Sequence, residues 1–149
     1  MRIAKGLAAI VIAVASLTSA ASTVAAQDVS AEWKAYVEYV GAVAKATKLE
    51  DLYQYVAAKQ VDFYKNFNKS DGPKVLQGIK DTMTSVGAFS GTMHLVREDV
   101  EPTARYLILE ATTPDNKTIQ GRVKMIREGG WVKLASIPDD EEWHEVKKK

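Results

Sequence analysis

The feature that most constrains this chain is a change in the spacing of its apolar residues near residue 88. Between residues 30 and 86, apolar side chains recur every three or four positions, which is the spacing of helices with one buried face. Over residues 89–137 they alternate with polar side chains, which is typical of half-buried β-strands. Helices and strands in separate blocks predict an α+β domain whose N-terminal helices pack on one face of an antiparallel sheet.

The first helix is expected over about residues 30–46. Asp28 and Ser30 are good N-cap residues, because their side-chain oxygens can accept hydrogen bonds from the amides of the first turn. The residues expected on its buried stripe are Trp33, Tyr36, Val37, Val40 and Ala44.

Three further helical segments are expected before the sheet. Thr47 and Glu50 have the spacing of a capping box, which predicts the start of a second helix. The apolar pattern continues over residues 61–67, either as a third short helix or as a bent continuation of the second. Pro73 suits the first turn of the last helix, and Gly87 suits its C-terminal end.

Four strands are expected in the second half of the chain, over residues 89–96, 105–111, 119–125 and 131–137. Short turns between the last three indicate an antiparallel meander, so the sheet is predicted to be four-stranded and antiparallel. The third strand alternates most regularly, and one of its faces should be buried. Ile119, Val123 and Met125 should face the helices, and Gln120, Arg122 and Lys124 should face water.

The first 26 residues have the layout of a secretory signal peptide. Arg2 and Lys5 precede an apolar run over residues 7–17, and small residues lead to a cleavage site expected between Ala26 and Gln27. A membrane-spanning helix needs about 20 apolar residues, so the short run favours cleavage over an uncleaved anchor. We therefore expect an exported protein, periplasmic or secreted, with a single domain over residues 27–149 and a charged tail from about residue 139.

Cysteine content and charge limit the class of protein further. The chain has no cysteine, which excludes disulfides and the lipid-carrying cysteine of a lipoprotein. Two of its 20 Lys and Arg residues lie in the expected signal peptide, so the remainder has 18 bases against 19 acids and a net charge of −1. Such a balance gives no electrostatic reason to bind nucleic acid, and no stable membrane insertion is expected after cleavage.

No motif in the sequence points to a metal site, a cofactor or a catalytic group. The two histidines, His94 and His144, lie far apart and have no metal-ligand spacing, so we interpret them as surface residues. The acidic run at residues 139–142 lacks the glycine and the alternating ligands of a calcium loop. There is no GxSxG motif and no glycine-rich phosphate loop.

The order of elements resembles the nuclear transport factor 2-like (cystatin-like cone) superfamily, and within it small exported bacterial domains of unknown function. The resemblance is carried by TKLEDLYQYV at residues 47–56, the helix that begins at Pro73, the PDNK turn at 114–117, and RVKMIREGGWVKL at 122–134. It implies a curved four-stranded sheet that forms a cone around the helices.

The chain differs from that family in its last strand. Members usually have Trp followed two positions later by an aliphatic residue on the same face, whereas Trp131 is followed by Lys133. Either Trp131 lies on the outer face of the sheet, or the Gly129–Gly130 turn contains a bulge that resets the register.

Three functions remain open from the sequence, and a non-enzymatic role is favoured. The first is an exported domain that binds a small ligand or a protein partner in the cell envelope. The second is an acid–base enzyme of the isomerase or dehydratase type, with a carboxylate such as Asp62 or Glu110 beside a tyrosine in a cone pocket. The third is a structural domain that forms homodimers through the outer face of the sheet. An aromatic stripe is expected in the core rather than around a pocket: Trp33, Tyr36, Tyr53, Tyr64 and Phe67.

Overall fold

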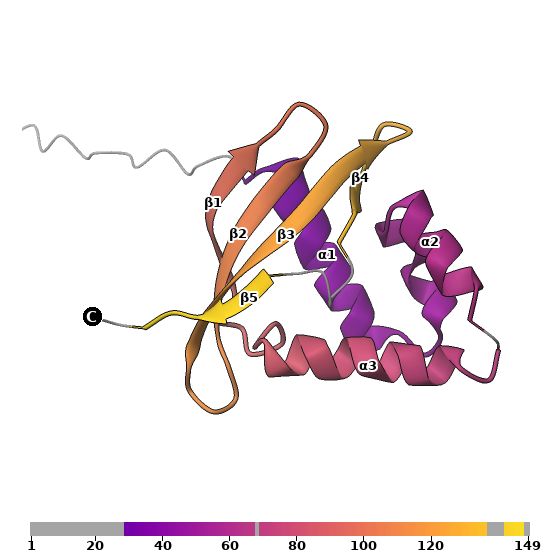
Figure 1. Cartoon of the computed structure of the whole chain (residues 1–149), viewed down its shortest axis with the longest axis horizontal. Helices are drawn as coiled ribbons and strands as arrows, with labels where there is room; N and C mark the ends of the chain where they lie inside the picture. The colour runs from indigo at the N-terminus through magenta and orange to yellow at the C-terminus, as the bar shows by residue number, and fades with distance from the viewer. Residues whose placement is uncertain (1–28, 68, 137–141, 148–149) are drawn as a thin grey trace, which may run out of the picture.

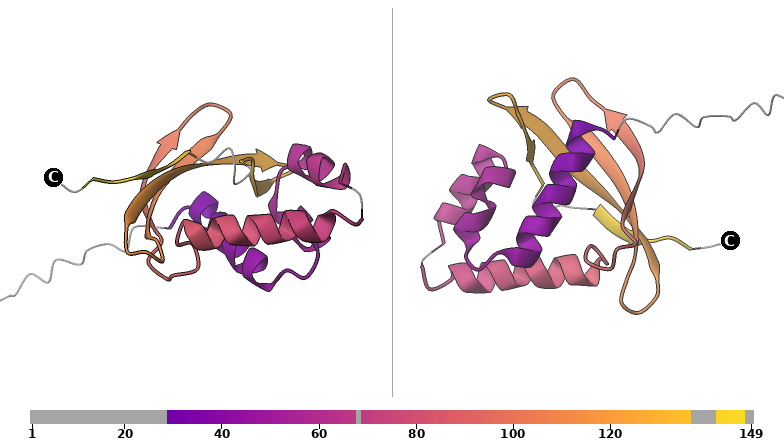
Figure 2. Two further views of the ribbon diagram at one scale, coloured as in Figure 1. Left: turned by 60° about the horizontal axis from the view of Figure 1, so that its bottom comes forward. Right: turned by 180° about the vertical axis from the view of Figure 1, so that it is seen from behind.

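The fold has the predicted α+β architecture, with four helices and an open antiparallel sheet of five strands in the described part of the chain (Figure 1). The structure is a computed structural model that describes residues 29–67, 69–136 and 142–147. The sheet is curved, and α1 crosses its concave face (Figure 2). Within the described ranges, no helix combines the length and the apolar character needed to cross a membrane.

The elements follow one another as α1 (Ala31–Lys45), the 3-10 helix η1 (Leu49–Tyr55), α2 (Ala58–Lys65), α3 (Gly72–Ser85), β1 (His94–Val100), β2 (Arg105–Thr112), β3 (Thr118–Glu128), β4 (Trp131–Leu134) and β5 (Glu142–Glu145).

Helix α1 begins where it was predicted but buries a different face. Ser30 is its N-cap, and the Ser30 Oγ accepts a hydrogen bond from the Trp33 backbone N–H at 3.0 Å. The predicted stripe is wrong at Val37 and Ala44, which are exposed. Glu32, a charged residue, occupies the first position of the buried face. A prediction from apolar residues alone leaves Glu32 out and therefore places the buried stripe on a different side of the helix. The buried residues are Glu32, Tyr36, Tyr39, Val40 and Val43.

The segment after α1 forms η1 instead of the α-helix expected from a capping box at Thr47 and Glu50. The helix begins one residue later than predicted, so the capping carboxylate belongs to Asp51. Its Oδ2 accepts hydrogen bonds from the backbone N–H groups of Thr47 at 3.0 Å and Lys48 at 3.2 Å. The hydrogen bond from Thr47 is the largest reason why the pKa of Asp51 lies below its usual value.

Helix α2 is separate from η1. This agrees with the first of the two predicted alternatives, a third short helix. Val56 forms a parallel bridge with Leu134, and the Ala57 N–H donates to the Leu134 carbonyl at 2.7 Å. The chain between the two helices therefore lies along the edge of β4. This arrangement covers a sheet edge that would otherwise expose unpaired backbone groups.

Helix α3 confirms the predicted boundaries at Pro73 and Gly87. Pro73 lies in the first turn, where its missing N–H costs no hydrogen bond. Gly87 has φ 72°, and the following Ala88 N–H donates to the Met83 carbonyl at 2.9 Å, which closes the helix in a Schellman-type motif.

The sheet has one strand more than predicted, and its first strand is displaced along the sequence. Residues 89–93 form turns, because Gly91 has positive φ and the Ser90 hydroxyl bonds to neighbouring backbone groups. Strand β1 begins only at His94 and continues to Val100, through residues that the sequence suggested were a polar link. The order β1-β2-β3-β4 is the predicted meander.

Strand β5 lies where a charged tail was expected. It pairs antiparallel with β3 on the same edge as β4, with Trp143 opposite Gly121. A Cβ atom at residue 121 would overlap the indole ring of Trp143, so glycine is needed for this close approach. Trp143 packs against the hydrophobic core. The predicted end of the fourth strand at Ile137 and most of the acidic run lie outside the described residues.

The core fills the space between α1 and the concave face of the sheet. The predicted alternation of β3 is confirmed, because Val123 and Met125 are fully buried and Lys124, between them, is partly exposed. The largest fully buried side chains are Tyr36, Tyr39, Leu52, Met83, Leu107, Leu109, Met125 and Leu134. The interior thus consists mainly of Leu, Val and Tyr side chains with two Met side chains, packed closely together.

Trp131 lies on the outer face of the sheet, which was the first of the two predicted alternatives. The ladder between β3 and β4 is regular from Glu128–Trp131 to Met125–Leu134. Trp131 therefore points to the face opposite Leu134, and 72% of its surface is exposed.

Candidate functional site

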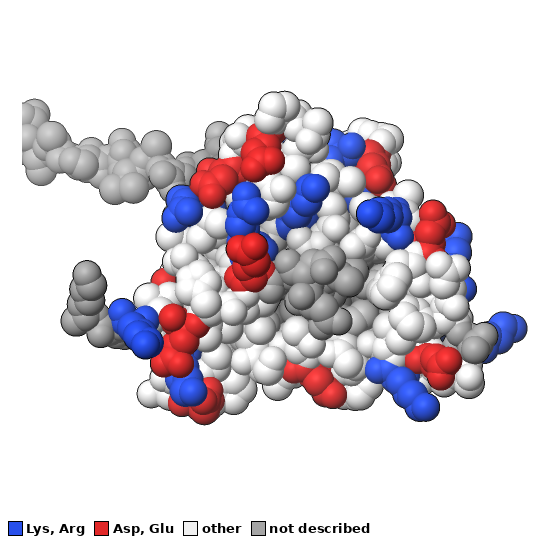
Figure 3. Space-filling view, in the orientation of Figure 1, with Lys and Arg blue, Asp and Glu red and all other residues white. Residues whose placement is uncertain are grey.

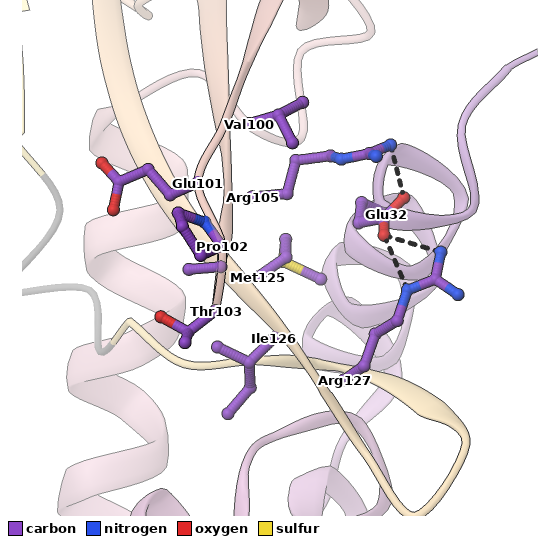
Figure 4. A pocket seen from close by; sticks show the side chains of 10 residues that line it. Glu32, Val100, Glu101, Pro102, Thr103, Arg105, Met125, Ile126 and Arg127 are labelled. Carbon is purple, nitrogen blue, oxygen red and sulfur yellow. Dashed lines mark hydrogen bonds and ion pairs between the residues drawn. The ribbon is translucent and has the colours of Figure 1, made fainter.

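A pocket of about 420 Å³ lies beside the beginning of β2, and we call it the Arg127 pocket (Figure 4). It combines charged and apolar side chains. Those that matter for its chemistry are Glu32, Val100, Pro102, Arg105, Met125, Ile126 and Arg127. Its volume lies in the lower part of the range of small-molecule sites, about 300–1,000 Å³.

The pocket exists because β3 is longer than its neighbour β2. Arg105, the first residue of β2, pairs with Met125, but β3 continues to Glu128. Residues 126–128 therefore have a strand partner only on the β4 side. The turn at residues 101–104 borders the resulting notch.

A buried carboxylate forms the polar wall of the Arg127 pocket. Glu32 is only 3% exposed. Its Oε1 accepts hydrogen bonds from Arg127 Nε at 3.1 Å and Arg127 Nη2 at 2.9 Å. Its Oε2 accepts a hydrogen bond from Arg105 Nη1 at 3.1 Å. One carboxylate thus joins α1 to β2 and β3, as the dashed lines in Figure 4 show.

The ion-pair network extends to β1 through Glu98. Arg105 Nη1 also donates to Glu98 Oε2 at 3.1 Å. The Ser30 hydroxyl donates to the other oxygen of the same carboxylate. Two arginines therefore balance two glutamates, and the N-terminus of α1 is tied to three neighbouring strands.

The pKa of Glu32 is held below its usual value. Burial, the largest single influence, raises the pKa because it disfavours the charged form. The hydrogen bonds from Arg127, the backbone N–H of Glu32 and the positive charges of Arg105 and Arg127 lower the pKa, and together they outweigh burial. Glu32 is therefore charged at neutral pH. An effective general base has a pKa near the working pH, so Glu32 is poorly suited to that role.

The rest of the Arg127 pocket has a mixed lining. Met125 lies at its base, while Ile126 and Pro102 lie at the end away from Glu32 (Figure 4). Glu101 and Thr103 line that same end, and Val100 is 69% exposed on the rim. The cavity therefore has apolar side chains between the Glu32 wall and a polar edge at residues 101–103.

The carboxylates and histidines considered from the sequence lie elsewhere. Asp62 is exposed on α2, and Glu110 is partly exposed on the convex face of β2. His94 is exposed on β1, and His144 is exposed on β5. Among the residues that the structure describes, no group of three or more His, Asp or Glu side chains could hold a metal ion.

The aromatic stripe is only partly a core feature. Tyr36 and Tyr64 are buried, and Trp33 packs against the core. Tyr53, Tyr64 and Phe67, however, also line a second pocket of about 370 Å³ between η1, α2 and the start of α3. The prediction that these rings form core rather than pocket lining is therefore correct for Trp33 and Tyr36 on α1 and incomplete for Tyr53, Tyr64 and Phe67.

The convex face of the sheet carries charges of both signs. In Figure 3, basic and acidic side chains are interspersed over this face. Arg122 illustrates the pattern, because its guanidinium lies 3.5 Å from the centre of the Tyr106 ring and 3.5 Å from Glu101. Paired charges of this kind give the face no large field of a single sign.

Glu32, Arg105 and Arg127 were not identified as site residues from the sequence. One signal was available for Glu32, because it precedes Tyr36 and Tyr39 by four and seven positions and so shares their helix face. The two arginines have no comparable signal, since they become neighbours of Glu32 only when the sheet forms.

No protein-family model matches the chain, and neither a curated protein nor a solved structure matches it.

Proposed function

We propose that the protein is an exported, non-catalytic domain of the nuclear transport factor 2-like superfamily, and that it binds a small amphipathic ligand in the Arg127 pocket. The ligand's apolar part would lie on Met125, Ile126 and Pro102. Its polar end would face the charged wall formed by Glu32 and the two arginines.

The observation that carries this proposal is the complete pairing of Glu32. Both of its oxygens accept hydrogen bonds from arginines, and its pKa is lowered. A carboxylate in this state positions charge but does not readily take up a proton at neutral pH. Glu32 is therefore suited to holding the two arginines at the wall of the pocket and poorly suited to acid–base turnover.

Two further features support the proposal. Helix α1 lies against the concave face of a curved antiparallel sheet, an arrangement compatible with the cone of this superfamily. The space that a catalytic cone pocket would need is occupied by buried side chains such as Tyr39, Met83 and Leu107. What remains accessible is the smaller cavity at the rim of the sheet.

An NMR titration with hexanol, hexanoate and hexylamine would test the binding. These probes share one apolar tail and differ in the charge of the head group. We expect at least one of them to shift the Ile126 methyl signal and the Nε–H signals of Arg105 and Arg127 saturably, with a Kd of about 1 mM or lower. The head group that binds best identifies the polarity of the natural ligand.

Variants distinguish this pocket from non-specific contact. Ile126→Arg places a long side chain in the cavity and should abolish the shifts, whereas Lys124→Gln on the same strand should leave them unchanged. Shifts that persist in Ile126→Arg, or the absence of shifts with all three probes, would show that the pocket is not a binding site. A substrate whose turnover disappears in Glu32→Gln would contradict the non-catalytic role.

A further inference from the structure

Trp131 lines a further cavity, which is separate from the Arg127 pocket. A cavity of about 330 Å³ lies where β4 meets α1 and η1, and we call it the Trp131 pocket. The residues that define its chemistry are Glu38, Gln54, Tyr55, Trp131, Val132 and Lys133. Trp131 is 72% exposed, so most of the indole ring is available to a ligand.

The hairpin fixes the position of the indole ring. Gly129 and Gly130 both have positive φ, at 56° and 81°, which is the conformation of a two-residue type I′ turn. This turn holds Trp131 opposite Glu128, whose carboxylate accepts a hydrogen bond from the Ala58 N–H at 2.9 Å. The hairpin that carries the ring is therefore attached to the start of α2 by this hydrogen bond.

The polar side chains of the Trp131 pocket offer both donors and acceptors. The Lys133 ammonium donates to the Gln54 carbonyl, which leaves the exposed amide side chain of Gln54 available. Glu38 is exposed on α1, and no ion pair involves it within the described ranges. Glu38 and Lys133 carry opposite charges, so the pocket favours neither an anion nor a cation.

These features match a neutral pyranose ring. One face of such a ring presents polarised C–H groups, which are attracted to the negative face of an indole. Its hydroxyls each donate and accept hydrogen bonds, as Glu38, Gln54 and Lys133 together require. We infer that the Trp131 pocket binds a sugar unit of a neutral glycan, with the ring stacked on Trp131.

A peptide fits this site less well. Peptides that add to a sheet need an open strand edge. At Leu134 the edge of β4 is covered by the chain between η1 and α2, through the Val56–Leu134 bridge and the hydrogen bond from Ala57 to Leu134. At most three residues of β4, 131–133, are left for pairing with a peptide, which is the lower limit of strand length.

The test uses the indole N–H signals of the three tryptophans, Trp33, Trp131 and Trp143, in ¹H–¹⁵N spectra. Linear trisaccharides of glucose, N-acetylglucosamine and mannose are the probes, and glycerol is the control for non-specific hydroxyl contact. We expect at least one trisaccharide to move the Trp131 signal saturably, with half-saturation in the millimolar range. The signals of Trp33 and Trp143 should stay in place.

Variants make the assignment specific. Tyr55→Ala should weaken binding at least tenfold, and Trp131→Ala should abolish it without unfolding the protein, because the ring is mostly exposed. Lys34→Gln, on the exposed side of α1, should have no effect. The inference is overturned if none of the trisaccharides moves the Trp131 signal at 50 mM, or if glycerol moves it equally. It is also overturned if Trp131→Ala binds sugar as well as the unaltered protein does.

Discussion

Glu32 is a charged residue in a position that the apolar pattern of α1 would assign to a hydrophobic one. It lies in the first turn of the helix, where the unpaired N–H groups and the helix dipole favour a negative charge. Arg105 and Arg127 then supply the remaining hydrogen bonds. A single carboxylate thereby fixes the end of α1 on the sheet and forms the charged wall of the Arg127 pocket.

Replacing Glu32 with Gln should lower the free energy of unfolding at pH 7 by about 2–3 kcal/mol. This loss is at or below the lower end of the range expected when a buried ion pair is broken, because both arginine side chains reach solvent. Arg127→Gln should cost about 1 kcal/mol or less, since 64% of that side chain is exposed. Urea denaturation of the two variants and the unaltered protein measures the difference.

The same variant should also change how stability depends on pH. The pKa of Glu32 is lowered in the folded state, so its stabilisation is complete above the pKa of the unfolded chain, near 4.5. It is lost as the pH falls through the lower folded value. The difference between unaltered protein and Glu32→Gln should therefore be constant from pH 6 to 8 and shrink below pH 4. A difference that grows on acidification would contradict this interpretation.

At the scale of elements, the sequence correctly predicts the helix ends and the strand alternation that depend on residues close together in the chain. Ser30, Pro73 and Gly87 mark helix ends through local hydrogen bonds and backbone angles, and all three are confirmed. The alternation of β3 is likewise local. The first and last helices and the meander follow from such signals, whereas the division between η1 and α2 was left open.

The elements that the sequence misses depend on contacts distant along the chain. Strand β5 is short and polar, with Trp143 as its one large apolar residue, and it is held by β3 and the space above Gly121. The start of β1 depends on turn hydrogen bonds around Ser90 that override the alternation of residues 89–93. Local periodicity carries no information about either contact.

Gly121→Ala tests the attachment of β5. The added methyl group overlaps the Trp143 ring, so either the ring or the strand must move. We expect a loss of stability of about 1–3 kcal/mol, typical of overpacking, and faster hydrogen exchange in β5. Gly78→Ala is the matched control, because its methyl group meets no neighbour and removes a helix-interior glycine, which should stabilise the protein by up to about 1 kcal/mol. Equal stability of the Gly121→Ala variant and the unaltered protein would argue against close Trp143 packing.

At the scale of the whole molecule, the site was beyond sequence reasoning. Glu32, Glu98, Arg105 and Arg127 come from α1 and three strands, and the longest separation in this network is 95 residues. Their proximity is a product of the curvature of the sheet and of the length difference between β2 and β3. A ligand bound at the rim of the sheet, as proposed, would leave the packed interior undisturbed.

The N-terminal 26 residues bear on where the protein is located, because they are predicted to direct its export. If the N-terminal segment is a signal peptide, protein recovered from the producing cell should begin at Gln27. Intact-protein mass spectrometry would then show a chain of 123 residues, and Ala26→Arg should block its formation. A mature protein that retains Met1 to Ala26 would contradict cleavage, and the uncleaved anchor would then be the better explanation.

The central claim about the Arg127 pocket is that its buried carboxylate, Glu32, stays charged at neutral pH and so is not an acid–base catalyst. Its most direct test is the pH titration of the Glu32 side-chain carboxyl carbon by ¹³C NMR. We predict a midpoint below 4.5, the ordinary value for glutamate, because arginine hydrogen bonds and charges outweigh burial. A midpoint near neutral pH, at about 6–7, would contradict the account and would instead identify Glu32 as a candidate acid–base catalyst.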